Sequence, residues 1–432
     1  MGPTKSAVGA AADNKHAPAE KKQFDPEALE ASTGKGWLFE LLLSYPRRVI
    51  CVLRSCFRVL HVPFCKWYIV LRYDDVREVL THDREFPVAW SRKMRGLTNG
   101  KNFVLGMKRG AKYEKSYTQL ATAFPLEDVA ARVAKPAAEL ASKIVESTAA
   151  KANRELDAVE ELITTVPARL CESYFGIEVK DPVLFAKWTL AISAYTFGPT
   201  PDKRIERLAE AAVGELSGAI RRSIAAAKAG SARGTPLHRL VTAQPAIDDD
   251  TIHAQLFGMV LGFIPTNVLA GGNMLETLLR RPDFLERTRT AALADDDELL
   301  WRCLREALRF RHINPGPWRA CPNGYTLGAD GPSPYRIAPG KNVLAIIQSA
   351  MFDSRRIERP NVFDPYRRDE DYMVFGVGQH WCLGAYIAKA QITQTFKPLL
   401  KREGLRAVRN RSVRTKRFND LFPLHLIVGF DK

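Results

Sequence analysis

The sequence predicts a mainly α protein with small β-sheets, and three observations lead to this fold class. Residues 126–232 are mostly helical in composition, with Ala-rich stretches and apolar residues three and four positions apart. A long capped helix is expected over Asp249–Arg281. After Pro315 the chain turns into short β-like runs separated by turn residues. Because no long linker divides the chain, we expect residues 36–432 to form one domain.

The N-terminal part of the chain is expected to change character near residue 36. Residues 1–35 are rich in Ala, Lys, Glu and Gly and lack the apolar centre of a signal peptide, which predicts a disordered tail. Residues 47–67 are predicted to be a buried helix leading into a strand. Lys66–Arg72 is expected to be a strand, Tyr73–Leu80 a capped helix, and residues 87–102 a loop.

Two further elements are expected in the second half of the chain. Residues 295–311 are predicted to be a helix. Residues 421–429 are predicted to be a last strand or hairpin arm.

The formal net charge of +16 has a local source. Residues 401–417 carry eight basic side chains against the single acid Glu403. No nucleic-acid-binding motif accompanies them, so we expect a solvated basic face and no nucleic-acid partner, with a dock for an acidic protein as the alternative.

The cysteine pattern and the hydropathy of the sequence indicate where in the cell the protein is expected to lie. The seven cysteines are spread along the chain without a Cys-x-x-Cys spacing, which favours free thiols and a reducing, cytoplasmic compartment. No run of eighteen apolar residues occurs, so no membrane span is expected.

The stretch Phe375–Gly384 carries the strongest chemical signal. Its three glycines allow a tight turn and close approach to a flat ligand. Cys382 precedes a run of helix-forming residues, and a helix N-terminus favours the thiolate. Because a lone buried thiolate is costly, a metal is its natural partner. The alternative interpretation is a glycine-rich turn with a structural cysteine.

The spacing Phe-x-x-Gly-x-His-x-Cys-x-Gly in this stretch resembles the haem-ligand loop of the cytochrome P450 family. Other pieces follow the order of that family: Glu306-Ala-Leu-Arg309, Arg319 in Pro-Trp-Arg-Ala, and Phe363-Asp-Pro-Tyr-Arg367. The resemblance covers about residues 37–430 and is densest after residue 250.

This resemblance implies the cytochrome P450 fold, with haem b between the long central helix and the cysteine loop. Cys382 would be the proximal iron ligand, and Phe375 would pack beside it. His380 and Arg319 would bind the haem propionates. Glu306 and Arg309 would lock the core near Arg367, as a structural pair.

The first departure from the family lies in the long helix. Thr266 stands where the family usually has its distal alcohol, but Pro265 replaces the preceding acid. Proline inside a helix frees the carbonyl of Leu261 and kinks the chain. Asn267 is a neighbouring amide that some related peroxide-using enzymes employ. We therefore predict Pro265, Thr266 and Asn267 as the distal catalytic residues, with a harmless kink as the alternative.

The second departure concerns the family's His and Arg pair near residue 113. Tyr113 and Tyr117 occupy these places by alignment, and we predict that both donate hydrogen bonds to a propionate. Lys112 or Lys115 would then supply the positive charge.

The expected function is oxygen insertion into a hydrophobic small molecule by a monooxygenase that takes electrons from ferredoxin and ferredoxin reductase. The alternative is a peroxide-driven peroxygenase or a fatty-acid hydroperoxide isomerase that needs no redox partner, which Pro265 favours. A haem protein that binds its ligand without turnover is a third, different class.

Overall fold

The computed structural model describes residues 24–31, 46–61, 66–198, 201–408, 413 and 415–431. Its α-helices are α1 (Pro26–Glu30), α3 (Pro46–Cys56), α4 (Tyr73–Thr81), α5 (Ser91–Leu97), α6 (Ala111–Ala123), α7 (Lys135–Ala149), α8 (Thr165–Leu170), α9 (Pro182–Phe197), α10 (Lys203–Lys228), α11 (Pro236–Val241), α12 (Asp249–Leu279), α13 (Pro282–Leu293), α14 (Asp297–Phe310), α15 (Ile347–Ala350) and α16 (Ala385–Leu400). The π-helical turns are Val129–Ala134, Ala158–Thr164 and Cys171–Phe175, and the 3-10 turns are Val104–Gly106, Asp369–Asp371 and Gly378–His380.

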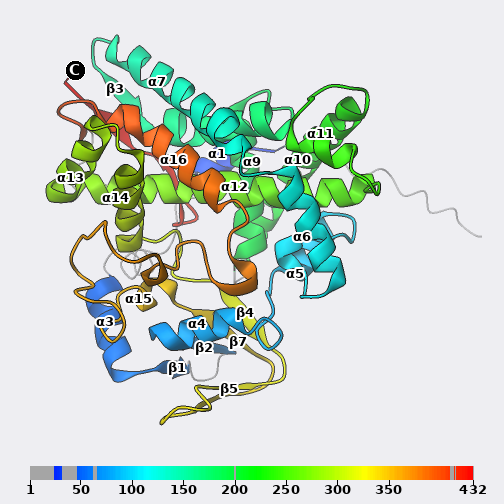
Figure 1. The fold of residues 1–432 in the computed structure, drawn as a ribbon, viewed down its shortest axis with the longest axis vertical. Helices are drawn as coiled ribbons and strands as arrows, with labels where there is room; N and C mark the ends of the chain where they lie inside the picture. The colour runs from blue at the N-terminus through cyan, green and yellow to red at the C-terminus, as the bar shows by residue number, and fades with distance from the viewer. Residues whose placement is uncertain are drawn as a thin grey trace, which may run out of the picture.

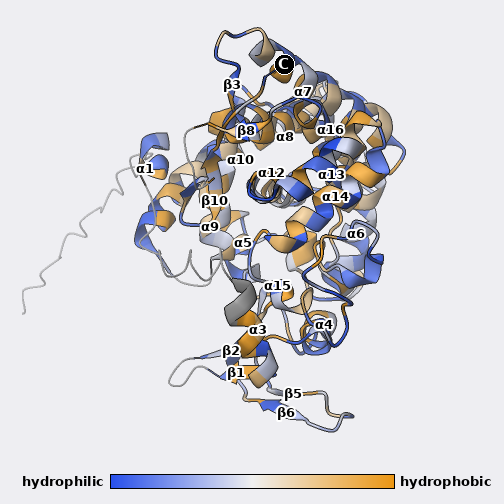
Figure 2. Ribbon diagram, turned by 90° about the vertical axis from the view of Figure 1, so that its left-hand side faces the viewer, coloured by the Kyte–Doolittle hydropathy of each residue, from blue (hydrophilic) through white to orange (hydrophobic). Residues whose placement is uncertain are grey.

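Helix α12 forms the centre of the helical part of the molecule. It crosses the ribbon horizontally in Figure 1, and Figure 2 shows it nearly end-on among α8, α10, α13, α14 and α16. The helix begins at a cap in which the Asp248 side chain accepts the backbone N–H of Thr251. By length and composition it could cross a membrane, but 89% of its most apolar window is buried inside the protein. It is therefore a core helix in this fold.

Four small sheets accompany the helices. The largest has the strand order β1 (Val59–His61), β2 (Trp67–Val70), β7 (Lys341–Ala345) and β4 (Trp318–Cys321), and only its β2–β7 pair is parallel. The other sheets pair β3 (Glu155–Asp157) with β11 (Ile427–Gly429) and β8 (Arg406–Ala407), β10 (Phe422–His425) with β9 (Lys416–Phe418), and β5 (Tyr325–Leu327) with β6 (Tyr335–Ile337). The mainly α fold with small sheets that the sequence predicts is confirmed.

Three sequence-based expectations need correction. Residues 24–31 are ordered, because the Leu29 side chain is fully buried and Glu30 pairs with Lys187 at 2.6 Å, so the predicted tail over residues 1–35 fails for this segment. The remainder of that stretch lies outside the described residues. The expected loop over residues 87–102 contains helix α5. Helix α3 also exposes Val52, which is 63% accessible, and is not buried throughout.

A buried charge network fixes the segment that leads into the cysteine loop. The Glu306 carboxylate accepts hydrogen bonds from Arg309 at 2.7 and 2.8 Å, from Arg367 at 3.3 Å and from the Tyr372 hydroxyl at 2.9 Å. Arg309 in turn donates to the Met351 carbonyl at 3.0 Å. The pairing expected from the three-residue spacing is present. It ties α14 to the chain just before the cysteine loop.

We predict that Glu306→Gln lowers the free energy of unfolding by about 3–5 kcal/mol, because it leaves two buried arginines short of their counter-charge. Glu298→Gln is the matched control, since Glu298 pairs with Arg302 and Lys389 on the surface and should cost less than about 1 kcal/mol. Urea denaturation of both variants measures the difference. Equal losses in the two variants would show that the network does not fix the fold.

Candidate active site

The cysteine loop is a turn that leads into α16. Cys382 donates its backbone N–H to the Phe375 carbonyl at 2.9 Å, which closes the loop on itself. Gly376 and Gly378 have φ values of 72° and 69°, a region that L side chains rarely adopt. A Cβ at residue 378 would also lie 3.2 Å from the Leu80 carbonyl oxygen at the end of α4. The glycines of the motif therefore serve backbone geometry and close packing.

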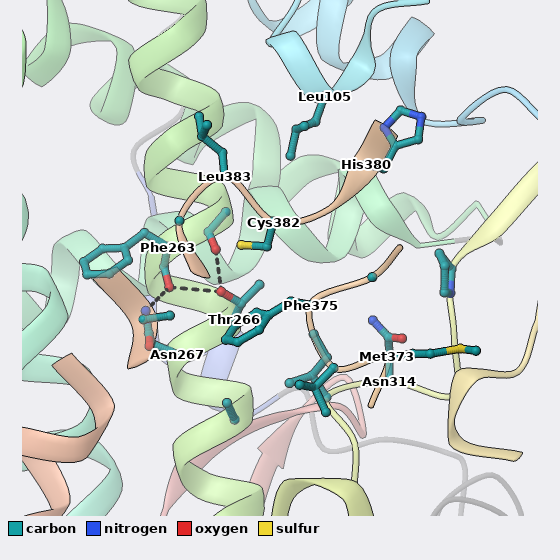
Figure 3. Close-up of a pocket in the computed structure, with 18 of the residues that line it drawn as sticks. Leu105, Phe263, Thr266, Asn267, Asn314, Met373, Phe375, His380, Cys382 and Leu383 are labelled. Carbon is teal, nitrogen blue, oxygen red and sulfur yellow. Dashed lines mark hydrogen bonds between the residues drawn. The ribbon is translucent and has the colours of Figure 1, made fainter. Parts of the chain in front are cut away.

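A cavity of about 350 Å³ lies between this loop and α12 (Figure 3). Cys382, Phe375 and His380 line it from the loop, and Thr266 and Asn267 line it from the helix. Arg319 on β4 completes the polar part of the lining, and most other lining residues are apolar. The structure thus brings six of the predicted site residues to one cavity.

The Cys382 sulfur faces this cavity from a half-buried side chain. Burial raises the pKa of its thiol to about 11, and a hydrogen bond from the Gly384 backbone opposes the shift only partly. A thiolate at this position therefore needs an adjacent cation, and a metal ion deprotonates a coordinating thiol. This donor set fits the iron of a haem, whose apolar ring would fill the largely apolar cavity.

Arg319 and His380 provide the polar end of the cavity. The Arg319 side chain is buried, which lowers its pKa to about 10 even though Asp83 opposes the shift. Among the described residues no carboxylate lies within ion-pair distance of Arg319, whose guanidinium donates to the Trp318 carbonyl at 3.3 Å. His380 Nε2 lies 3.7 Å from Asp83 Oδ1, and His380 Nδ1 has no partner within the described fold. A buried guanidinium without a paired carboxylate and an unpartnered imidazole nitrogen fit a ligand that brings its own carboxylates, as haem does.

In the distal helix α12, the Thr266 and Asn267 side chains donate hydrogen bonds to carbonyls of the same helix. Thr266 Oγ1 donates to the Gly262 carbonyl and, at 3.2 Å, to the Phe263 carbonyl. Asn267 Nδ2 donates to the Phe263 carbonyl at 2.8 Å, as the dashed lines in Figure 3 show. Helix α12 is continuous through Pro265, which is buried and does not line the cavity. The alcohol hydrogen and one of the two amide hydrogens are therefore bound to helix carbonyls, while Asn267 Oδ1 has no partner within the described fold. Among the described residues no acid lines the cavity beside them.

The donation of hydrogen bonds by Tyr113 and Tyr117 to a propionate stays a prediction. Neither residue lines the cavity. The Tyr113 hydroxyl donates to the Gln379 carbonyl at 3.1 Å, so that it clamps α6 to the cysteine loop. Burial raises the pKa of Tyr113, which keeps the hydroxyl protonated as a donor.

Sequence reasoning missed two residues of the site. Asp83, in the loop after α4, is a partly buried acid beside Arg319 and His380, and burial raises its pKa. Trp301 on α14 lines the cavity and stacks on Phe375 with ring centroids 5.9 Å apart. Asp83 lies 297 positions before His380, so no local pattern reveals it. Trp301 lies five residues before the recognised Glu306 and points to the same core.

Comparison with known proteins supports this arrangement. The family model described as Cytochrome P450 matches residues 245–419. The chain is 26% identical over 349 residues to "Cytochrome P450 monooxygenase PikC" of Streptomyces venezuelae, covering 78% of this chain and 77% of that protein. It is 22% identical to "Cyclomarin C epoxidase CymV" of Salinispora arenicola, covering 60% of this chain and 62% of that protein. The ligand-free structure of cytochrome P450 TbtJ1 superposes with a TM-score of 0.74 at 22% identity, covering 90% and 98% of the two chains.

The fold, the cysteine loop and these matches define a haem-thiolate protein. The chain belongs to the cytochrome P450 family. Membership of this family implies a haem-thiolate cofactor, in agreement with the donor set around Cys382.

We predict that Arg319→Met accelerates haem loss by roughly tenfold to a hundredfold, because a charge-assisted hydrogen bond contributes about 1.5–3 kcal/mol. Transfer of haem from the loaded protein to apomyoglobin measures the rate. Arg336→Met is the matched control, because Arg336 is exposed on β6 and lies outside the cavity. If both variants lost haem at the wild-type rate, Arg319 would not bind a propionate.

Proposed function

We propose that this protein is a monooxygenase that uses haem b, ligated by Cys382, to insert an oxygen atom into a hydrophobic small molecule. The observation that supports this proposal best is the cavity itself, which has the Cys382 sulfur on one wall and Thr266 of α12 on another. We further propose that residues 36–432 form one catalytic domain, that α1 packs against it, and that the protein is cytoplasmic.

In this reaction one atom of dioxygen enters the substrate, and the other leaves as water after taking two electrons and two protons. The bound haem supplies the iron at which dioxygen is activated, and its thiolate ligand favours O–O cleavage. The protein holds the thiolate, excludes water with an apolar lining and must conduct protons past Thr266. The names of PikC, a monooxygenase, and CymV, an epoxidase, support oxygen transfer as the reaction class.

A second candidate is peroxide-driven oxidation or rearrangement of a lipid hydroperoxide, and a specific observation favours it. Pro265 has neither an acid nor a backbone N–H, and the Thr266 hydroxyl and one Asn267 amide hydrogen are bound to helix carbonyls. None of the acids of this helix lines the described cavity, so none is placed there to relay protons. A peroxide carries its two electrons with it and does not require protons to be delivered to dioxygen.

One comparison separates these two functions. The haem-loaded protein is mixed with candidate substrates, once with reduced ferredoxin and its reductase and once with hydrogen peroxide or a lipid hydroperoxide. We expect product with the electron-transfer system. We also expect Pro265→Asp to raise the fraction of electrons that end in product, because it restores an acid beside Thr266. Product in the peroxide reaction, with none in the reaction that contains ferredoxin and its reductase, would contradict the monooxygenase proposal and support the second candidate.

The electron donor is proposed to be an acidic protein of the ferredoxin type that docks beside the cysteine loop. Trp381, which precedes the ligand cysteine, and Tyr386 are exposed there and pack edge to face with centroids 5.9 Å apart. The Tyr113–Gln379 hydrogen bond places the start of α6 beside this pair. Four exposed cations occur on that segment: Lys108, Arg109, Lys112 and Lys115. Complementary charge steers an acidic partner to such a face.

We predict that Lys112→Glu combined with Lys115→Glu raises the KM for reduced ferredoxin roughly tenfold at low ionic strength, and less in high salt. Steady-state kinetics at several donor concentrations measure the effect. The double variant Lys203→Glu with Arg207→Glu is the matched control, because both residues are exposed on α10. Equal effects of the two charge reversals would contradict docking at α6.

A further inference from the structure

Aromatic rings from outside the cysteine loop form part of the cavity lining. Five of them come from five separate places in the chain: Trp90, Phe103, Phe175, Phe197 and Phe263. The Trp90 and Phe197 rings meet edge to face, with centroids 5.3 Å apart and planes at 82°. The Phe175 and Phe263 rings lie 5.1 Å apart at 31°. We call these five residues the aromatic wall.

The backbone holds the Phe103 part of this wall in place. Gln255 on α12 accepts the Val104 N–H and donates to the Asn102 carbonyl, both at 3.0 Å. The Phe103 ring occupies the space beside Gly258, where any added Cβ would collide with it. Phe103 is therefore fixed against the central helix before any ligand arrives.

The Trp90 and Phe197 part is held in a different way. Lys93, three residues after Trp90, donates to the carbonyls of Tyr195 at 2.7 Å and Gly198 at 3.1 Å at the end of α9. A cation at a helix C-terminus is favourable. Trp318 Nε1 also donates to the Phe197 carbonyl at 3.2 Å. The edge-to-face pair is thus built into the free protein.

The aromatic wall offers no charged anchor. The ionisable residues of the cavity lining are His312, Arg319, His380 and Cys382. The last three belong to the cofactor side, and His312 is buried with its Nδ1 against the Asn314 carbonyl at 2.8 Å. The Lys93 ammonium is already bound to carbonyls. A substrate carboxylate would therefore lose its water without gaining a partner at the wall.

We propose that the substrate is an uncharged aromatic molecule, selected by edge and face contacts with the aromatic wall. This inference rests on the proposed function, because it concerns the distal side of the same haem cavity. Aromatic rings prefer offset or edge-to-face contacts with other rings, and these contacts add to the effect of simple burial. The preformed wall favours such a ligand because its rings need little reordering on binding.

The test compares ethylbenzene with ethylcyclohexane, which has the same carbon skeleton but is the more hydrophobic molecule. Dodecanoate serves as the anionic chain. Dissociation constants are measured on the haem-loaded protein by calorimetry and by the shift of the Soret band. We expect ethylbenzene to bind roughly three- to tenfold more tightly than ethylcyclohexane. Equal or reversed affinities, or tightest binding of dodecanoate, would overturn the proposal.

Two variants identify the residues that make the distinction. Phe197→Leu should weaken ethylbenzene binding roughly three- to tenfold and change ethylcyclohexane binding less than twofold. Phe57→Leu is the matched control, because Phe57 is exposed outside the cavity. If Phe197→Leu is poorly folded, Trp90→Leu tests the same pair. A uniform loss for both ligands would show that the wall acts by burial alone and overturn the proposal.

The binding outcomes can be told apart from a failure of the proposed function. If the proposed function is wrong, no oxygenated product forms with either oxidant. Calorimetry then still measures whether the cavity binds ethylbenzene more tightly than ethylcyclohexane.

Discussion

A cysteine sulfur removed from water carries negative charge only when a cation lies beside it, and the site around Cys382 depends on this constraint. Burial raises the pKa of the thiol to about 11, so the thiolate form requires a metal ion. The rest of the loop keeps the sulfur in place. The Cys382 backbone N–H donates to the Phe375 carbonyl, and the Tyr113 hydroxyl on α6 donates to the Gln379 carbonyl of the loop. Glu306 on α14 holds the segment just before the cysteine loop by accepting a hydrogen bond from the Tyr372 hydroxyl. The fold thus prepares one sulfur for one metal.

In the proposed reaction, the opposite wall of the cavity would influence which oxidant the haem iron uses. In α12 the Thr266 hydroxyl and the Asn267 amide satisfy helix carbonyls, and Pro265 stands where an acid would relay protons. Proline also leaves the Leu261 carbonyl without its helical N–H partner, so local side-chain hydrogen bonds stabilise this part of the helix. The distal helix is therefore stable and apolar but poor in donors, and proton supply is the demanding step of a reaction that starts from dioxygen.

Local sequence patterns predicted the parts of the protein that depend on neighbouring residues. The cysteine loop and the Glu306–Arg309 pair occur at fixed short spacings, so the sequence revealed them and the structure contains them together. Helix α5 was missed because tertiary contacts, such as those of Lys93 with the end of α9, stabilise a short segment that carries glycine. Asp83 was missed for a similar reason, since only folding brings it to His380. Tyr113 was assigned by position alone, and the sequence did not reveal the hydrogen bond from its hydroxyl to the loop backbone.

The most direct measurement of the central claim is the absorption spectrum of the reduced protein with carbon monoxide. Thiolate ligation by Cys382 predicts the strongly red-shifted Soret band of haem-thiolate proteins for the wild type. Cys382→Ser should abolish that band, and Cys51→Ser, at an exposed cysteine, should leave it unchanged. A red-shifted band that persists in Cys382→Ser would show that another residue ligates the iron and would contradict the account.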